Sequence, residues 1–353
     1  MENKDGIREL KWPEYIRLRP GMYMGQVNIS GFFEILRGVF YSYLSGEQSK
    51  SVLIELKGNK SAKISFDDLD NSQFKNNWAT LELKSKSNPF WVELSALNAF
   101  SSQFEVKGYN DLGEILFTEE YEKGILKLSN CSNVPYSRIE FEFILDNEIW
   151  GEDFKLNEDF LMSKVREFAY LHKKVKFNIK YFVEGESCNV VFHYKGGLRD
   201  KIQLEKLKGH GGDYFEMVIE EELNGLAVEI AFVFQNHIVD EPFLKSYAND
   251  YYTSENGTHV DGFLKGLTFG VMKYFQKYDL TEKYKISEKR MREDLIAIIN
   301  VRLDAPIFSG CVRNKLANTE IIEPITNCVA ELFFKRIESD KESIQKLIRK
   351  FEK

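Results

Sequence analysis

The sequence contains few cysteines, the residues on which small disulfide-bonded or zinc-binding domains depend. Its 353 residues include only four cysteines, which are widely spaced and form no C-x-x-C pair with histidines nearby. This spacing suggests neither a disulfide framework nor a cysteine zinc site, and it predicts buried free thiols. The sequence also lacks any run of about 18 apolar residues, and its first ten residues are too polar for a signal peptide. We therefore expect a cytoplasmic protein.

Positive charge and common catalytic motifs are also scarce. The net charge is -7, which argues against a protein whose whole surface grips nucleic acid. The five histidines show no metal-ligand spacing, and no G-x-S-x-G, H-E-x-x-H or P-loop pattern occurs. These absences remove the best-known hydrolase, metalloprotease and P-loop classes.

The composition and length of the chain predict a folded protein of two domains. Hydrophobic residues make up 43% and charged residues 29% of a chain that is long enough for two cores. A glycine-rich charged stretch, KLKGHGGD at 206–213, is the best linker, so we expect domains at 1–205 and 206–353.

Apolar periodicity predicts mixed helices and strands in the first domain. A helix is expected over Ser30–Leu44 with Ser30 as its N-cap, and two more over 89–100 and 158–172. Alternating residues predict strands at 51–58, 62–68, 78–86, 104–109, 114–121, 125–130, 138–146, 175–184 and 188–194. The fold class is therefore α+β, a mixed sheet with helices on one face.

The second domain repeats this theme on a smaller scale. Strands are expected at 214–220, 226–234 and 295–303, with a helix over 259–278. A long helix should begin near Thr319 and continue through the basic run 335–353. We interpret that run as a solvated helix face, and direct DNA binding through Lys346, Arg349 and Lys350 as a weaker hypothesis that a gel shift with charge-reversed variants would test.

Five ordered blocks resemble one family. They are IRELKWPEYIRLRPGMYMG at 7–25, ALNAFSSQFEV at 96–106, FHYKGGLRD at 192–200, YANDYYTSENGTHVDGF at 247–263 and REDLIAIINVRLDAPIFSG at 292–310. Together they resemble the N-terminal ATPase and transducer region of DNA gyrase B and of its topoisomerase IV counterpart, which are type IIA topoisomerases. The resemblance implies a Bergerat (GHKL)-like sandwich followed by a transducer of ribosomal-S5-like fold. It also implies a following DNA-cleaving region, so a chain that stops at Lys353 is not expected to cut DNA alone.

The resemblance places the family's catalytic helix residues on unsuitable side chains. Gly38 falls at the glutamate that orients the attacking water, and Ser42 falls at the asparagine that binds magnesium. Neither residue can perform these roles. Glu34 lies one turn earlier, and we interpret it as a solvated charge.

Other parts of the implied nucleotide site are also changed. Asp67 matches the adenine-binding aspartate, but Leu69 and Asn71 replace the glycines after it. The phosphate loop falls on Ser87–Trp91, which lacks glycine, while Asn98 matches the helix that follows. The short interval 72–86 implies a deleted ATP lid.

The transducer contributes a lysine to the family's site, in a Q-T-K turn that aligns with Cys311, Val312 and Arg313. Arg313 keeps the charge but not the compact ammonium group, and Lys315 matches a second family lysine that we interpret as a surface cation. Tyr23, in the GMY turn, is expected to pack and not to touch a ligand.

Losing the base, the metal ligand, the phosphate loop and the lid together predicts a protein that does not hydrolyse ATP. We expect no cofactor and no metal. The expected function is protein binding, as a regulator or accessory subunit of a type II topoisomerase, with a topoisomerase subunit or a second copy as partner and DNA only indirectly. The alternative is a divergent ATPase module of a split topoisomerase, which would bind ATP and magnesium; the short N-terminal arm MENKDG counts against ATP-dependent dimerisation.

Overall fold

The structure is a computed structural model that describes residues 10–44, 50–69, 91–130, 136–207, 212–235, 243–284, 286–310, 313–349 and 351. The chain divides into two compact units, Met1–Lys195 and Gly196–Lys353. Among the residues just given, no helix is both long and apolar enough to cross a lipid bilayer.

The first unit is built on an eight-stranded sheet. Its strands are β1 (Ser51–Leu56), β2 (Ser61–Asp67), β3 (Ser101–Tyr109), β4 (Ile115–Glu122), β5 (Ile125–Asn130), β6 (Arg138–Leu145), β7 (Lys176–Val183) and β8 (Glu186–Phe192). They lie in the order β5-β4-β3-β6-β2-β1-β7-β8. All neighbours are antiparallel except β1 and β7, which are parallel. Every strand expected within the described residues is present, whereas the strand expected at 78–86 lies outside them.

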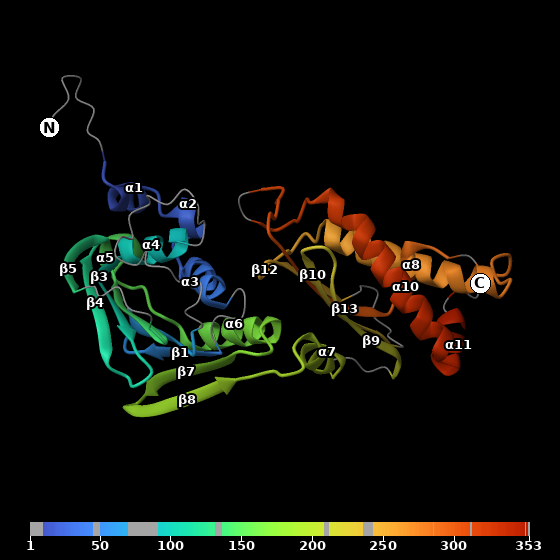
Figure 1. The fold of residues 1–353 in the computed structure, drawn as a ribbon, viewed down its shortest axis with the longest axis horizontal. Helices are drawn as coiled ribbons and strands as arrows, with labels where there is room; N and C mark the ends of the chain where they lie inside the picture. Colours follow the sequence, from blue (N-terminus) through green and yellow to red (C-terminus); the bar gives the residue numbers. More distant parts are fainter. Residues whose placement is uncertain are drawn as a thin grey trace, which may run out of the picture. The chain divides into compact units, whose positions relative to one another are not determined.

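Helices cover one face of this sheet (Figure 1). They are α1 (Trp12–Leu18), α2 (Gly21–Met24), α3 (Ile29–Leu44), α4 (Trp91–Ala99), α5 (Asn147–Trp150) and α6 (Glu158–Leu171). The core beneath α3 is aromatic: Tyr43 stacks on Phe66 with ring centroids 4.3 Å apart, and Phe40 lies 5.6 Å from Phe168. Because alternate residues of a strand face opposite sides, the buried apolar residues of β2 and β6 meet these helices, whereas Ile144 of β6 is exposed on the other face. The predicted α+β sandwich is confirmed.

The start of α3 differs from expectation by its capping residue. The helix begins at Ile29, and the side-chain oxygen of Asn28 accepts a hydrogen bond from the Gly31 backbone N–H at 3.1 Å. Asn28 therefore performs the N-terminal capping role expected of Ser30, because its longer amide reaches an otherwise orphan donor. Ser30 lies inside the first turn.

The second unit is a five-stranded sheet with a helical layer. Its strands are β9 (Asp213–Glu222), β10 (Leu226–Gln235), β11 (Phe243–Ala248), β12 (Tyr251–Tyr252) and β13 (Leu295–Leu303), in the order β12-β11-β13-β10-β9. Its helices are α7 (Leu198–Lys206), α8 (Thr258–Lys277), α9 (Glu288–Arg292), the 3-10 turn η1 (Thr319–Ile321), α10 (Ile322–Ser339) and α11 (Lys341–Arg349). α8 and α10 pack side by side. β11 was not predicted because FLKSYA shows no apolar alternation.

The C-terminal helix is not continuous, contrary to expectation. It breaks at Asp340, with φ -120° and ψ 84°, before α11 begins. The bend returns Ile344 and Leu347 to the same core as Ile337, which a straight helix would carry away from it.

The division between the two units lies before Gly196, earlier than the boundary expected at 205/206. The reason is α7, which packs on β10 and β13 and so belongs to the second unit. Glycine and charge mark the sequence that follows this helix, whereas tertiary packing decides to which unit the helix belongs.

Candidate functional site

The candidate site of the first unit lies where α3 meets α4, at Gly38. Gly38 is buried, and a Cβ atom added to it would lie 2.2 Å from Cγ and 2.7 Å from Cδ of Glu93. Real Cβ atoms do not approach other atoms so closely, so any side chain at position 38 would displace Glu93. The position that the resemblance gives to the catalytic glutamate is thus covered by a carboxylate from another helix.

Glu93 stands in the first turn of α4. Backbone N–H groups that lack intrahelical partners point out of this end of a helix, and the helix dipole favours negative charge there. Glu93 supplies that charge from within the chain. The sequence reasoning missed this residue; the signal was an acid in the stretch between the implied phosphate loop and Asn98, where the family needs phosphate to approach.

The remaining α3 positions are engaged within the helix. The Ser42 hydroxyl donates a hydrogen bond to the Gly38 carbonyl at 2.9 Å. Glu34 is half exposed, as expected of a solvated charge, and it also accepts a hydrogen bond from Arg37 Nη2 at 2.7 Å, which was not predicted. Neither side chain supplies a carboxylate or amide at the crossing of α3 and α4.

Asn98 lies at the other end of α4 and is completely buried. Neither its side-chain oxygen nor its side-chain nitrogen has a hydrogen-bond partner among the described residues. An unsatisfied buried amide costs about 1–3 kcal/mol, so such a residue calls for an explanation.

Asp67, at the end of β2, belongs to the other face of the sheet. Strand alternation places it with Ser65, opposite Phe66, whose ring packs under α3. Its carboxylate lies 4.0 Å from Nε of Arg138, and the guanidinium of Arg138 lies 3.9 Å from the ring centroid of Tyr109. Burial raises the pKa of Asp67, although the charge of Arg138 opposes the shift. The structure therefore does not bring Asp67 together with Gly38 and Ser42.

A polar hollow of about 660 Å³ surrounds Asp67. It is lined by Lys50, Asp67, Asp68, Leu69, Asn110, Asp111, Gly113, Ser137 and Arg138. Most of the implied phosphate loop, the interval 72–86 and Asn71 lie outside the described residues. Within the described residues, no three His, Cys, Asp or Glu side chains are grouped so as to hold a metal ion.

Arg313 and Lys315 belong to the second unit and are explained by local contacts there. Arg313 has a left-handed φ of 57°, and its guanidinium lies 4.2 Å from the ring centroid of Tyr251. Lys315 is exposed, and its carbonyl accepts from the Ser309 N–H at 3.0 Å. Cys311 and Val312 lie outside the described residues.

Tyr23 packs as predicted, edge-on against Phe100 with ring centroids 6.3 Å apart. His259 is also a packed residue: it is fully buried, and its Nε2 lies 3.2 Å from Oγ1 of Thr253.

Comparison with solved structures shows the fold. The ATPase domain of Thermus thermophilus gyrase B matches with a TM-score of 0.78 and 21% identity, covering 97% of this chain and 94% of that one. Gyrase B of Myxococcus xanthus matches with a TM-score of 0.78 and 20% identity, covering 96% and 98%. The ATPase region of Saccharomyces cerevisiae topoisomerase II is more distant, with a TM-score of 0.59 and 15% identity, covering 95% and 99%.

Comparison with sequences agrees. DNA gyrase B of Streptococcus pyogenes is 25% identical over 98% of this chain, and that of Staphylococcus aureus is 26% identical over 93%. The chain covers 56% and 54% of those proteins, so it spans about half their length. The family model described as DNA gyrase B matches residues 170–353, which is more than half of the chain. With a matching fold across both units, the chain belongs to the DNA gyrase B family.

Proposed function

We propose that this protein is a non-hydrolysing member of its family that works by binding another protein, as a regulator or accessory subunit of a type II DNA topoisomerase. The relatives are named as subunits, which supports a topoisomerase subunit as the first partner to test and a second copy of the chain as the next. No cofactor is needed for this role.

The observation that carries the proposal is Glu93 lying over Gly38. A magnesium nucleotide needs uncovered backbone N–H groups for its phosphates and an oxygen-bearing side chain for its metal. Here the first turn of α4 already carries a carboxylate, which would repel phosphate, and the hydroxyl of Ser42 is directed to the Gly38 carbonyl. These described residues of α3 and α4 therefore support the proposal that no magnesium nucleotide binds here.

Calorimetric titration of Mg-ATP into the full chain tests the nucleotide half of the proposal. We expect no saturable heat of binding and no phosphate release. The control variant Glu93→Gln keeps the size of the side chain and removes its charge. Stoichiometric binding by the wild-type chain, with turnover abolished by Asp67→Asn, would refute the proposal.

The partner half needs a separate measurement. We expect the immobilised chain to bind a purified type II topoisomerase subunit from the same cell equally well with and without ATP, and to change the supercoiling rate of the assembled enzyme. Absence of binding to every subunit, together with a monomeric sedimentation coefficient, would contradict it.

One observation favours a second candidate, the ATPase module of a split topoisomerase. Asn98 on α4 is buried, and its amide has no hydrogen-bond partner among the described residues. A bound ligand would satisfy such an amide, so this arrangement is typical of a ligand-binding side chain without its ligand. This candidate predicts measurable ATP turnover that Asn98→Ala abolishes while the circular dichroism spectrum stays unchanged. Turnover that is absent from both proteins eliminates it.

A further inference from the structure

Strand β5 is the last strand at one edge of the first unit's sheet within the described residues. Among the described strands it pairs with β4 alone, and all six of its residues are exposed. Three of them are large and apolar: Ile125, Leu126 and Leu128 are 50%, 43% and 51% exposed. Sheet edges of this kind are usually blocked, because their unpaired backbone groups readily accept another strand.

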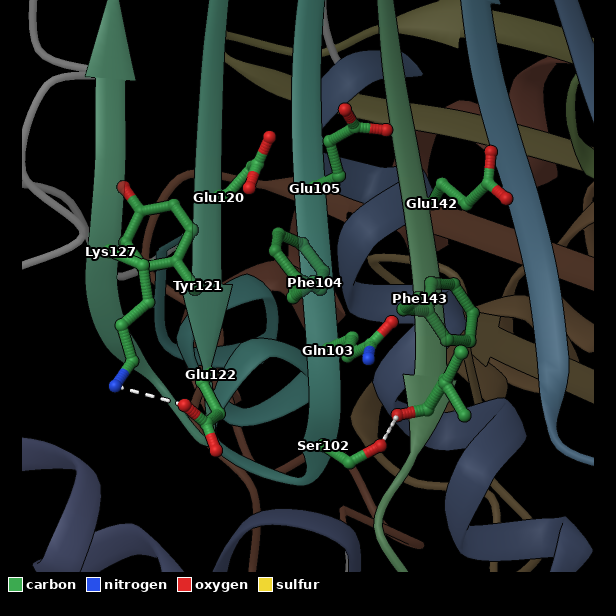
Figure 2. Close-up of a pocket in the computed structure, with 11 residues that line it drawn as sticks. Ser102, Gln103, Phe104, Glu105, Glu120, Tyr121, Glu122, Lys127, Glu142 and Phe143 are labelled. Carbon is green, nitrogen blue, oxygen red and sulfur yellow. Dashed lines mark hydrogen bonds and ion pairs between the residues drawn. The ribbon is translucent and has the colours of Figure 1, made fainter.

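A row of three glutamates lies beside this edge on the face away from the helices. Glu120, Glu105 and Glu142 are direct cross-strand partners on β4, β3 and β6, and Figure 2 shows their carboxylates in line across the three strands. Leu128 of β5 opposes Glu120 and so continues the row to the edge. Like charges directly opposite one another destabilise a sheet, so the row carries a local energetic cost.

The negative charge of the row is only partly compensated. Lys107 pairs with Glu105 at 2.7 Å, and Lys57 pairs with Glu142 at 2.6 Å. No ion pair within the described residues engages Glu120, the member nearest β5. A hollow of about 430 Å³ runs over the row, lined by four glutamates and one lysine, Lys127, which pairs with Glu122.

We propose that β5 and the glutamate row form a docking site for an extended, basic segment of a partner protein. The segment adds as a strand to β5 through backbone hydrogen bonds. Its apolar side chains cover Ile125 and Leu128, and its Lys or Arg side chains reach across β5 to Glu120, in the field of the other glutamates of the row. This inference rests on the proposed function for the premise that the chain acts by binding a protein, and it adds the chemistry of the bound segment.

The negative charge of the glutamate row also favours a basic partner segment over a second copy of the chain. Pairing β5 with β5 of another copy would bring two glutamate rows next to each other, and β5 carries one lysine to set against them. Repulsion between two such rows disfavours that pairing, whereas a basic segment gains from the same field.

A designed peptide tests the site. We would measure the fluorescence anisotropy of a labelled, end-capped peptide of alternating lysine and valine as full-length protein is added. The glutamate-valine peptide should bind at least about 10-fold more weakly because charge sets the specificity. A lysine-valine peptide with a central proline should also lose about 10-fold, because proline cannot donate to the ladder.

Variants locate the bound peptide. Glu120→Gln should weaken binding of the lysine-valine peptide by about 2-fold to 5-fold, since the residue is exposed and supports no ion pair within the described part of the chain. The matched control is Glu186→Gln, an exposed glutamate at the start of β8 on the opposite edge, which should leave affinity unchanged. Unchanged circular dichroism spectra would confirm that both variants fold.

The inference would be overturned by equal binding of the acidic and basic peptides or by equal effects of the two variants. It would also be overturned by concentration-dependent self-association that the basic peptide reverses, because the occupant of the site would then be a second copy of the chain. None of these measurements uses nucleotide. Binding to topoisomerase subunits that Glu120→Gln leaves intact would leave the proposed function standing while removing this site.

Discussion

At the scale of single residues, Gly38 and Glu93 are understood only as a pair. Gly38 is an unfavourable residue inside a helix, and Glu93 occupies the volume that a side chain at position 38 would need. The position of the Glu93 side chain therefore accounts for the glycine at position 38, and the missing side chain at position 38 makes room for Glu93.

A double-mutant cycle measures this coupling. Gly38→Ala should lower the free energy of unfolding by about 1–3 kcal/mol, because the new methyl group overpacks against Glu93. In a Glu93→Ala background the same change should become neutral or stabilise by up to about 1 kcal/mol through helix propensity. Urea unfolding measures all four proteins. Equal effects of Gly38→Ala in both backgrounds would show that the two residues do not contact each other.

Asn98 provides a second residue-scale prediction. Replacing a buried amide that lacks a partner by a similar apolar side chain removes a desolvation penalty, so Asn98→Leu should stabilise the chain by about 1–2 kcal/mol. The matched control is Asn318→Leu. That asparagine is equally buried but accepts from the Ile307 N–H at 2.6 Å and donates to the Ala305 carbonyl at 3.0 Å, so its loss should destabilise. Chemical denaturation measures whether each variant raises or lowers the free energy of unfolding.

His259 makes stability depend on pH. Burial lowers the pKa of His259 to about 3, so the folded chain keeps this side chain neutral while the unfolded chain protonates it near pH 6.5. Because the unfolded state then binds more protons, stability falls as pH drops from about 6.5 towards 3. At pH 5 this single group should cost about 2 kcal/mol relative to pH 7. The variant His259→Gln should lose that part of the slope in unfolding measured at successive pH values; an identical slope would disprove it.

At the scale of elements, the contact between α8 and α10 depends on glycine. A Cβ atom at Gly266 would lie 2.6 Å from Cβ of Val329 and 2.9 Å from the Thr326 carbonyl oxygen. The helix backbones therefore approach more closely than any larger residue would permit. Thr326 also donates to the Gly262 carbonyl across the same contact, at 3.2 Å.

Gly266→Ala should accordingly destabilise the second unit by about 1–3 kcal/mol, despite alanine's better helix propensity. The neighbouring Lys265→Ala is the control: Lys265 is exposed on the same helix, and its removal should change stability by no more than about 0.5 kcal/mol. Thermal unfolding followed by circular dichroism gives both values. A stabilised Gly266→Ala would mean that the helices can separate without cost.

Helices and strands were predicted correctly where the spacing of apolar residues within the segment itself indicates the structure. The strands flanking the sheet centre alternate clearly, and α3, α6 and α8 carry an apolar stripe, so their positions follow from sequence. β11 was missed because its burial does not alternate, and the break at Asp340 was missed because polar residues continue a helical pattern on both sides of it. In both cases packing against distant residues decides the structure.

At the scale of the whole molecule, nucleotide should leave stability unchanged. A ligand that binds only the folded state at 100 times its dissociation constant adds about 2.7 kcal/mol. On the proposed function, we expect millimolar Mg-ATP to leave the melting temperature of this chain unchanged within error, because Glu93 occupies the space at Gly38 and its charge would repel phosphate. Differential scanning calorimetry with and without Mg-ATP measures it, with Mg-GTP as a control for nonspecific ionic effects. A selective upward shift with ATP would favour the ATPase candidate.

Local periodicity and ordered motifs were enough to predict the α+β class, most of the described strands and the family. The resemblance carried by those motifs also predicts that Gly38 and Ser42 stand at the family's catalytic positions. Three features could not be predicted without the folded chain: Glu93 covers Gly38, Asp67 faces away from α3, and Glu105, Glu120 and Glu142 share one row. These facts depend on strand register and helix crossing between residues far apart in the chain, and they follow from the packing of the whole unit, which no local pattern encodes.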